Sequence, residues 1–259
     1  MCLILLAYRS HPDYPLILAA NRDEFYDRPT APAQFWSEAP LLLAGRDLRR
    51  GGTWLGVTRD GRWAAVTNFR ETARTMTGGR SRGELVKGFL AGGESPEAFF
   101  AQLNAEAGTY PGFNLLAGTP EELWYFSNRD GCGRPLAPGL YGLSNALLDT
   151  PWPKVVRSRK ALASALALTG FSLEAELFAL LADRRVPPDS DLPDTGFALP
   201  WERLLSPPFI LSPAYGTRSS TVLTLSGDGQ ASLIERTFPP GEGPDLFTEV
   251  RHEFSIKGG

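Results

Sequence analysis

The chain begins with Met1-Cys2-Leu3-Ile4-Leu5-Leu6. After a turn at His11-Pro12-Asp13, it continues with an apolar run from Leu16 to Ala20 and the polar cluster Asn21-Arg22-Asp23-Glu24. Short apolar runs on either side of a turn are typical of paired buried strands. The sequence therefore predicts that the chain opens with an antiparallel hairpin whose second strand ends in four polar residues.

Cys2 is the candidate nucleophile. Cysteine is small, so the initiator Met1 before it is commonly removed, and Cys2 would then carry both a thiol and a free α-amino group. An α-amino group has a pKa of roughly 7.7–8, so it can act as the base for its own side chain. The alternative is a small buried hydrophobic residue at the start of a strand, and position alone favours that interpretation.

The polar cluster at the end of the second strand is the other half of the candidate site. A hairpin would bring Arg22 and Asp23 close to Cys2, where a guanidinium favours the thiolate and a carboxylate can hold the α-ammonium. The alternative is a solvated turn carrying a surface ion pair of little energetic value. The residues alone leave both interpretations open.

The composition limits the class of protein. With 259 residues, 42% hydrophobic and 21% charged, the chain is expected to be a globular protein folded as one domain over residues 1–259. A net charge of -3 without a long basic run argues against a nucleic-acid partner. The apolar N-terminus lacks the features of a signal peptide, and no run is long enough to span a bilayer. We expect a soluble, cytoplasmic protein.

Cysteine and histidine are too scarce for a disulfide framework or a metal site. The chain has two cysteines, Cys2 and Cys132, and two histidines, His11 and His252, none in a metal-ligand spacing. We therefore expect no metal, and Cys132 is interpreted as a loop thiol without a role.

Strand and helix signals alternate in groups along the rest of the chain. Residues 29–40 are rich in proline and predict an irregular connection, and Asp60-Gly61 predicts a hairpin with a type I′ turn. Ser81 with Glu84 fits a capping box, and Ser95 before a proline fits a second helix start. Further elements are expected at 113–117, 123–126, 221–225 and 232–236 (strands), at 152–168 and 172–182 (helices), and at 186–200 (a long surface loop). This order favours an α+β fold with antiparallel sheets over a βαβ fold.

Six motifs in order resemble the NRDE family, whose animal relatives are called transport and Golgi organisation protein 2. Each motif alone is weak evidence, but the series in the same order is specific. The matching segments are Met1-Cys2-Leu3-Ile4, Ala20-Asn21-Arg22-Asp23-Glu24, Gly51-Gly52-Thr53-Trp54-Leu55-Gly56, Thr67-Asn68-Phe69-Arg70, Tyr141 to Asn145 with Asp149 to Lys154, and Tyr215 to Thr221.

This family is similar to N-terminal-nucleophile hydrolases of the choloylglycine hydrolase and penicillin V acylase type. The resemblance implies a four-layer αββα sandwich of two antiparallel sheets flanked by helices, and cleavage of an amide bond. Carried over by position, Cys2 matches the nucleophile, Arg22 and Asp23 the pair beside it, Asn145 the oxyanion-stabilising asparagine, and Arg218 a late arginine. The structural alternatives are that Asn145 closes a turn and that Arg218 pairs with a core carboxylate.

Further residues are expected to contact the ligand. Asn68 matches a second oxyanion-hole position, Asn21 is a polar candidate, and Trp54 and Trp152 can line an apolar pocket. The alternative is that these tryptophans pack in the hydrophobic core. The chain departs from the acylase pattern in its length, which is short for an acylase. In addition, a retained Met1 would leave the Cys2 thiol without the free α-amine that acts as its base.

Two functions remain open. The first is a cysteine-nucleophile hydrolase of a small amide, which needs no cofactor. The second, implied by the family resemblance, is a non-catalytic protein that binds and transfers haem, lipid or acyl-CoA, with tyrosine or cysteine as the ligand to haem iron.

Overall fold

The computed structural model describes residues 2–71, 79–131 and 133–256, and the strands among them form two antiparallel sheets. One has six strands in the order β10-β1-β2-β11-β12-β13, and the other has seven in the order β3-β4-β5-β6-β7-β8-β9. The bounds in the first sheet are β1 Cys2–Tyr8, β2 Leu16–Phe25, β10 Gly139–Leu143, β11 Tyr215–Leu225, β12 Gln230–Thr237 and β13 Thr248–Ser255. Those in the second are β3 Thr30–Trp36, β4 Ala39–Asp47, β5 Leu55–Thr58, β6 Trp63–Asn68, β7 Phe113–Gly118, β8 Leu123–Ser127 and β9 Arg134–Pro135.

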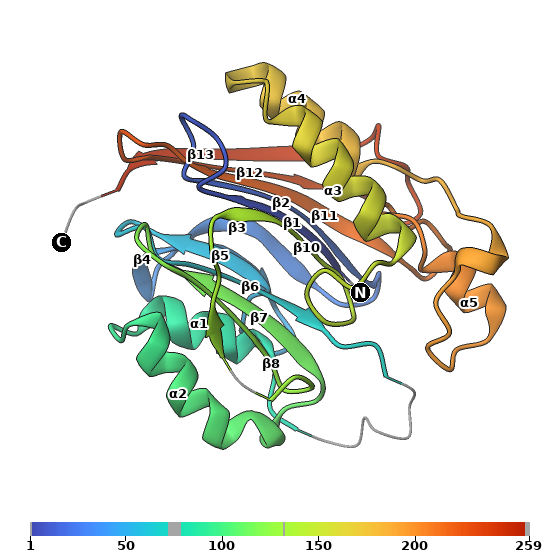
Figure 1. Cartoon of the computed structure of the whole chain (residues 1–259), viewed down its shortest axis with the longest axis horizontal. Helices are drawn as coiled ribbons and strands as arrows, with labels where there is room; N and C mark the ends of the chain where they lie inside the picture. Colours follow the sequence, from blue (N-terminus) through green and yellow to red (C-terminus); the bar gives the residue numbers. More distant parts are fainter. Residues whose placement is uncertain (1, 72–78, 132, 257–259) are drawn as a thin grey trace.

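The two sheets pack face to face, and helices cover the outer face of each (Figure 1). Helices α3 (Pro153–Ala165) and α4 (Gly170–Leu181) cover the six-stranded sheet, and α1 (Gly83–Ala91) and α2 (Pro96–Glu106) cover the seven-stranded sheet. Three clusters of buried apolar side chains fill the three spaces between these four layers. The expected four-layer αββα sandwich, an α+β fold, is confirmed.

The N-terminal hairpin is confirmed and is longer than expected. Strand β2 runs from Leu16 to Phe25, so the whole polar cluster is strand and pairs with β11, while only Asn21 and Arg22 of the cluster also pair with β1. Side chains alternate between the faces of a strand. Ile4 and Leu6 therefore point between the sheets, while Leu3 and Leu5 point towards α3 and α4.

The expected irregular connection at residues 29–40 is wrong. It contains strand β3 and the start of β4, which continues to Asp47. Pro32 is tolerated because β3 lies at the edge of its sheet, where a missing N–H breaks no ladder. A pattern rich in proline thus concealed two strands.

Two local predictions need correction, while a third is confirmed. The hairpin at Asp60-Gly61 exists, but only Gly61 has a positive φ, of 83°. The Gly61 N–H donates to Thr58 O at 3.0 Å, so the loop is a turn followed by a left-handed glycine, not type I′. Helix α1 begins at Gly83 with no side-chain cap, whereas Ser95 Oγ caps α2 by accepting from the Ala98 N–H at 3.2 Å.

The remaining helical segments lie close to where periodicity predicts them. Helices α3 and α4 fill most of the expected ranges 152–168 and 172–182. The surface loop at 186–200 leads into α5 (Leu199–Leu204), which lies at the end of the sandwich where the N-terminus lies (Figure 1). None of the described helices has the length and apolar character needed to cross a membrane.

Glu235 on β12 places a carboxyl group between the sheets, where it is 2% exposed and accepts a hydrogen bond from the Ala33 N–H at 2.8 Å. Burial raises the pKa of Glu235 from 4.5 to about 7. Between these two values the folded protein retains a proton that the unfolded chain has lost. The free energy of unfolding should therefore fall as pH rises through that window.

We predict that Glu235→Gln removes this fall and stabilises the protein at about pH 8 by up to about 3 kcal/mol. The amide keeps the acceptor for the Ala33 N–H without the cost of a buried charge. Urea unfolding at about pH 5 and about pH 8 measures the effect, with Glu249→Gln on exposed β13 as the control. If wild type and Glu235→Gln lose the same stability between the two pH values, the prediction is wrong.

Candidate active site

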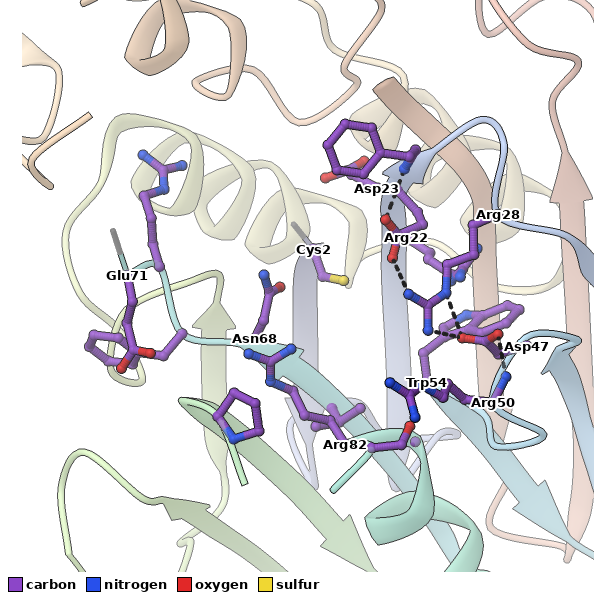
Figure 2. Close-up of a pocket in the computed structure, with 18 of the residues that line it drawn as sticks. Cys2, Arg22, Asp23, Arg28, Asp47, Arg50, Trp54, Asn68, Glu71 and Arg82 are labelled. Atoms are coloured by element: carbon purple, nitrogen blue, oxygen red, sulfur yellow. Dashed lines mark hydrogen bonds and ion pairs between the residues drawn. The ribbon is translucent and has the colours of Figure 1, made fainter. Parts of the chain in front are cut away.

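A cavity of about 750 Å³ opens where β1 begins and β2 ends, and Cys2 lies in its wall (Figure 2). Its lining comes from strand ends of both sheets, from the segment before α1 and from the segment around α5. The charged lining residues are Arg22, Asp23, Glu24, Arg28, Asp47, Arg50, Arg70, Glu71, Arg80 and Arg82. The apolar and aromatic ones are Phe25, Trp54, Val66, Phe69, Pro111, Phe197, Trp201, Leu205 and Tyr215.

Cys2 is half-buried at the first position of β1, directly opposite Arg22 in the strand register. Its backbone N–H donates to Asn145 Oδ1 at 3.3 Å, and its carbonyl oxygen accepts from Ser144 Oγ at 2.9 Å. Burial raises the pKa of the Cys2 thiol, and the Asp23 carboxylate raises it further, while the Asp23 N–H and the Arg22 guanidinium lower it. The backbone of Cys2 is thus held by two hydrogen bonds, and its thiol lies at the wall of the cavity.

Asn145 and Asn68 form a pair beside Cys2. Asn145 is fully buried, and its Nδ2 donates to Asn68 O at 2.8 Å and to Asn68 Oδ1 at 3.0 Å. Asn145 therefore holds the Cys2 nitrogen with one end of its amide and Asn68 with the other. Asn68 is the one of the two that lines the cavity, so its amide group is the better placed to meet an oxyanion.

Asp23 points to the opposite face of β2 from Arg22 and is buried. Its Oδ1 accepts from Thr217 Oγ1 at 2.7 Å, and its backbone carbonyl accepts from the Tyr215 hydroxyl at 3.2 Å. Burial raises the pKa of Asp23, while the nearby Lys154 ammonium lowers it. The Asp23 carboxylate and the Lys154 ammonium therefore lie close to each other beneath Cys2, at the start of β1.

Lys154 is a site residue that the sequence did not single out. It is 2% exposed, and its Nζ donates to Leu205 O at 3.0 Å. Burial lowers the pKa of Lys154 to about 8, against the opposing effect of the Asp23 carboxylate. One signal was available: a lysine next to Pro153 in the first turn of a helix opposes the helix dipole, so such a residue needs a compensating partner.

Arg22 and Trp54 form a stacked pair in the cavity wall. The Arg22 guanidinium carbon lies 4.2 Å from the centroid of the Trp54 ring. Trp54 in turn lies against Gly45, where a Cβ atom would come within 2.5 Å of the indole. Trp54 lines the cavity, and the lack of a side chain at Gly45 makes room for its ring.

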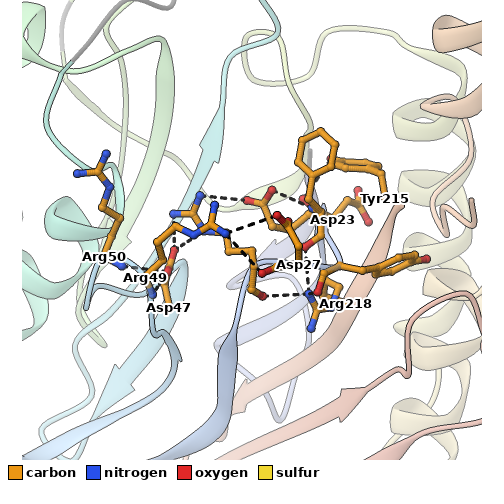
Figure 3. Close-up of polar contacts among 11 residues, drawn as sticks. Asp23, Asp27, Asp47, Arg49, Arg50, Tyr215 and Arg218 are labelled. Carbon is orange, nitrogen blue, oxygen red and sulfur yellow. Dashed lines mark hydrogen bonds and ion pairs between the residues drawn. The ribbon is translucent and has the colours of Figure 1, made fainter. Parts of the chain in front are cut away.

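Besides Asn145, three of the expected site residues lie outside the cavity lining. Arg218 Nη1 donates to the carbonyls of Phe25, Tyr26 and Arg28 at 3.1–3.2 Å, so it fixes the turn after β2 (Figure 3). Asn21 is 1% exposed, and its Nδ2 donates to the carbonyls of Leu181 and Pro208. Trp152 stacks on Arg70, whose guanidinium carbon lies 4.4 Å from the ring centroid. Their contacts among the described residues are structural.

The segment around α5 is attached to the cavity rim by a buried ion pair. Arg70 Nη1 lies 2.5 Å from Glu202 Oε2, and both side chains are less than 5% exposed. Glu202 also accepts a hydrogen bond from the Thr195 N–H at 3.2 Å. This ion pair fixes the segment that carries Phe197 and Trp201, and both of these side chains line the cavity.

Two solved structures resemble the chain at low identity. One is the N-acylethanolamine-hydrolyzing acid amidase ortholog of Caenorhabditis elegans, with a TM-score of 0.45 and 12% identity, covering 86% of this chain and 92% of that one. The other is a mutant of the conjugated bile acid hydrolase of Clostridium perfringens, with a TM-score of 0.42 and 8% identity, covering 100% and 98%.

Relatives by sequence are much closer. The chain is 37% identical to the Transport and Golgi organization protein 2 homolog of Bos taurus over 99% of this chain and 100% of that protein. It is 35% identical to the homolog of Homo sapiens, with coverage of 92% and 93%. The sequence model named Transport and Golgi organisation 2 matches residues 1–240. The chain therefore belongs to the Transport and Golgi organisation 2 family.

Proposed function

We propose that this protein is an N-terminal-nucleophile amidohydrolase that cleaves the C–N bond of a small acyl amide, with Cys2 as the nucleophile after removal of Met1. The observation that carries the proposal is the placement of Cys2 in the cavity wall with its nitrogen held by Asn145 Oδ1 at 3.3 Å. A free α-amine at this position would be oriented by Asn145 and would lie close to the Asp23 carboxylate.

The chemistry follows from these groups. The α-amine takes the proton of the Cys2 thiol, and the sulfur bonds to the amide carbon to give a tetrahedral oxyanion. The C–N bond then breaks, the departing amine takes the proton from the α-ammonium, and a thioester remains on Cys2. Water adds to the thioester with the α-amine again as base, releasing the carboxylic acid and restoring the thiol.

Two asparagines and two charged side chains support these reaction steps. The amide of Asn68 faces the cavity, and Asn145 fixes it; Asn145 remains the second candidate donor to the oxyanion. A preorganised donor of this kind contributes about 2.7–4 kcal/mol to the barrier reduction. Arg22 favours the thiolate, and Lys154 balances the charge of Asp23 beneath the nucleophile.

A second candidate function is binding without turnover, in which the same cavity carries haem, a lipid or acyl-CoA. The feature that favours it is the burial of the Cys2 thiol, which raises its pKa and so disfavours the thiolate that a nucleophile needs. Both histidines have other partners, His11 at Leu168 O and His252 at Ala33 O. Among the described lining residues, Cys2 and Tyr215 are of a type that binds haem iron, and the Tyr215 hydroxyl would have to give up its hydrogen bond to Asp23 O to do so.

Acylation of Cys2 separates the two functions. We predict that a Met1-free protein incubated with an acyl p-nitrophenyl ester gains one acyl group, seen by intact mass, and releases nitrophenol in a burst. Cys2→Ala should lose both signals, and Cys132→Ser is the matched control that should keep them. Labelling that survives in Cys2→Ala overturns the assignment of Cys2 as the nucleophile. A protein that retains Met1 and gains no label supports the binding function.

The reactivity of the thiol should depend on pH in a defined direction. Because burial raises the pKa of Cys2, the rate of its alkylation by iodoacetamide should reach half its maximum above the pH found for an exposed cysteine. Arg22→Gln should move this midpoint up by about one pH unit, since the guanidinium stabilises the thiolate. Arg62→Gln is the control, because Arg62 is likewise buried and stacked but on Phe89. An unchanged midpoint in Arg22→Gln would show that the Arg22 guanidinium does not stabilise the thiolate of Cys2.

A further inference from the structure

The arginines that line the cavity differ in how their charge is balanced. Arg28 lies 2.6 Å from Asp47, Arg70 lies 2.5 Å from Glu202, and Arg80 lies 2.5 Å from Glu106. Among the described residues, none of the lining arginines Arg22, Arg50 and Arg82 makes an ion pair; Arg50 is exposed to solvent, whereas Arg22 is buried and Arg82 is half-buried. The guanidinium groups of Arg22 and Arg82 therefore leave unbalanced positive charge inside the cavity.

Arg82 is placed by a close backbone contact. Gly52 and Gly83 meet so closely that a Cβ atom on Gly52 would lie 2.6 Å from Gly83 C, and the Thr53 N–H donates to Gly83 O at 3.3 Å. The Arg82 Nε donates to Gly112 O at 2.8 Å, which fixes the side chain and leaves its terminal amino groups without a described partner. Figure 2 shows the guanidinium of Arg82 pointing into the space beside Asn68 and Cys2.

Arg22 supplies the second group. It is 6% exposed, and its Nη1 is buried without a hydrogen-bond partner although the residue lines the cavity. A buried guanidinium with an unused N–H is costly unless another group satisfies it. Glu71 also lines the cavity, but it pairs with Arg129, so its charge is already balanced.

We propose that Arg82 and Arg22 form an anion subsite beside Cys2, and that the molecule in this cavity carries a carboxylate or phosphate group together with an apolar chain. This inference rests on the proposed function for the role of Cys2. Guanidinium groups bind carboxylate and phosphate oxygens through paired N–H donors. Phe69, Phe197 and Trp201 offer the apolar wall for the chain. The substrate class is therefore an acyl amide with an anionic group close to the scissile bond.

Binding to Cys2→Ala tests the subsite without any turnover, so its outcome is independent of whether the protein is an enzyme. Calorimetry should compare N-dodecanoylglycine and dodecyl phosphate with the neutral N-dodecanoylethanolamine. We expect at least one anionic compound to bind about tenfold more tightly than the neutral one. The tighter of the two identifies the anion as carboxylate or phosphate, and raising the salt concentration should reduce the preference.

The variants assign the preference to a residue. Arg82→Gln in the Cys2→Ala background should abolish the preference for the anion and leave the affinity for the neutral compound unchanged, while Arg82→Lys should retain part of it. Arg80→Gln is the matched control, since Arg80 also lines the cavity but is paired with Glu84 and Glu106, and it should keep the full preference. Equal affinity for all three compounds, or an undiminished preference in Arg82→Gln, overturns the proposal.

Discussion

The pairing of β1 with β2 sets Cys2 directly opposite Arg22, and the arrangement of the candidate site depends on that register. Because side chains alternate along a strand, Arg22 shares the face of Cys2, while Asn21 and Asp23 point to the helix-covered face. A slip of one residue would exchange these roles and also turn the apolar side chains of β1 to the wrong layers. The two apolar clusters on either side of this sheet therefore fix the position of Cys2 relative to its charged neighbours.

Around this hairpin the protein buries several charged side chains, although their burial does not favour stability. Asp23 and Lys154 lie beneath Cys2, Arg22 stacks on Trp54, and Arg70 is buried with Glu202. Such groups are weak contributors to stability because desolvation offsets their attraction. Their concentration around one cavity, with shifted pKa values, is the pattern of a functional site.

The proposed activity and the anion subsite divide the cavity between two tasks. In this proposal Cys2 provides the reacting thiol, and Asn68 and Asn145 provide the amide groups around it. They come from the start of β1, the end of β6 and the segment after β10. Arg82 comes from the segment before α1, where tight glycine packing sets its position. Reaction and recognition thus depend on separate segments that meet at one end of the sandwich (Figure 2).

The sequence alone determined the opening hairpin, the closeness of Arg22 and Asp23 to Cys2, the α+β class and the main helices, because these follow from local periodicity and turn residues. It missed β3 and β4, since an edge strand tolerates the prolines that suggest a loop. It also placed Arg218 and Asn21 at the site, whereas their hydrogen bonds hold the turn after β2 and the helix layer. The contributions of Lys154 and Arg82 were decided only by the tertiary structure. Each is far from Cys2 in the chain. The packing of α3 brings the charge of Lys154 close to Asp23 and Cys2, and the glycine pair places Arg82 in the cavity wall.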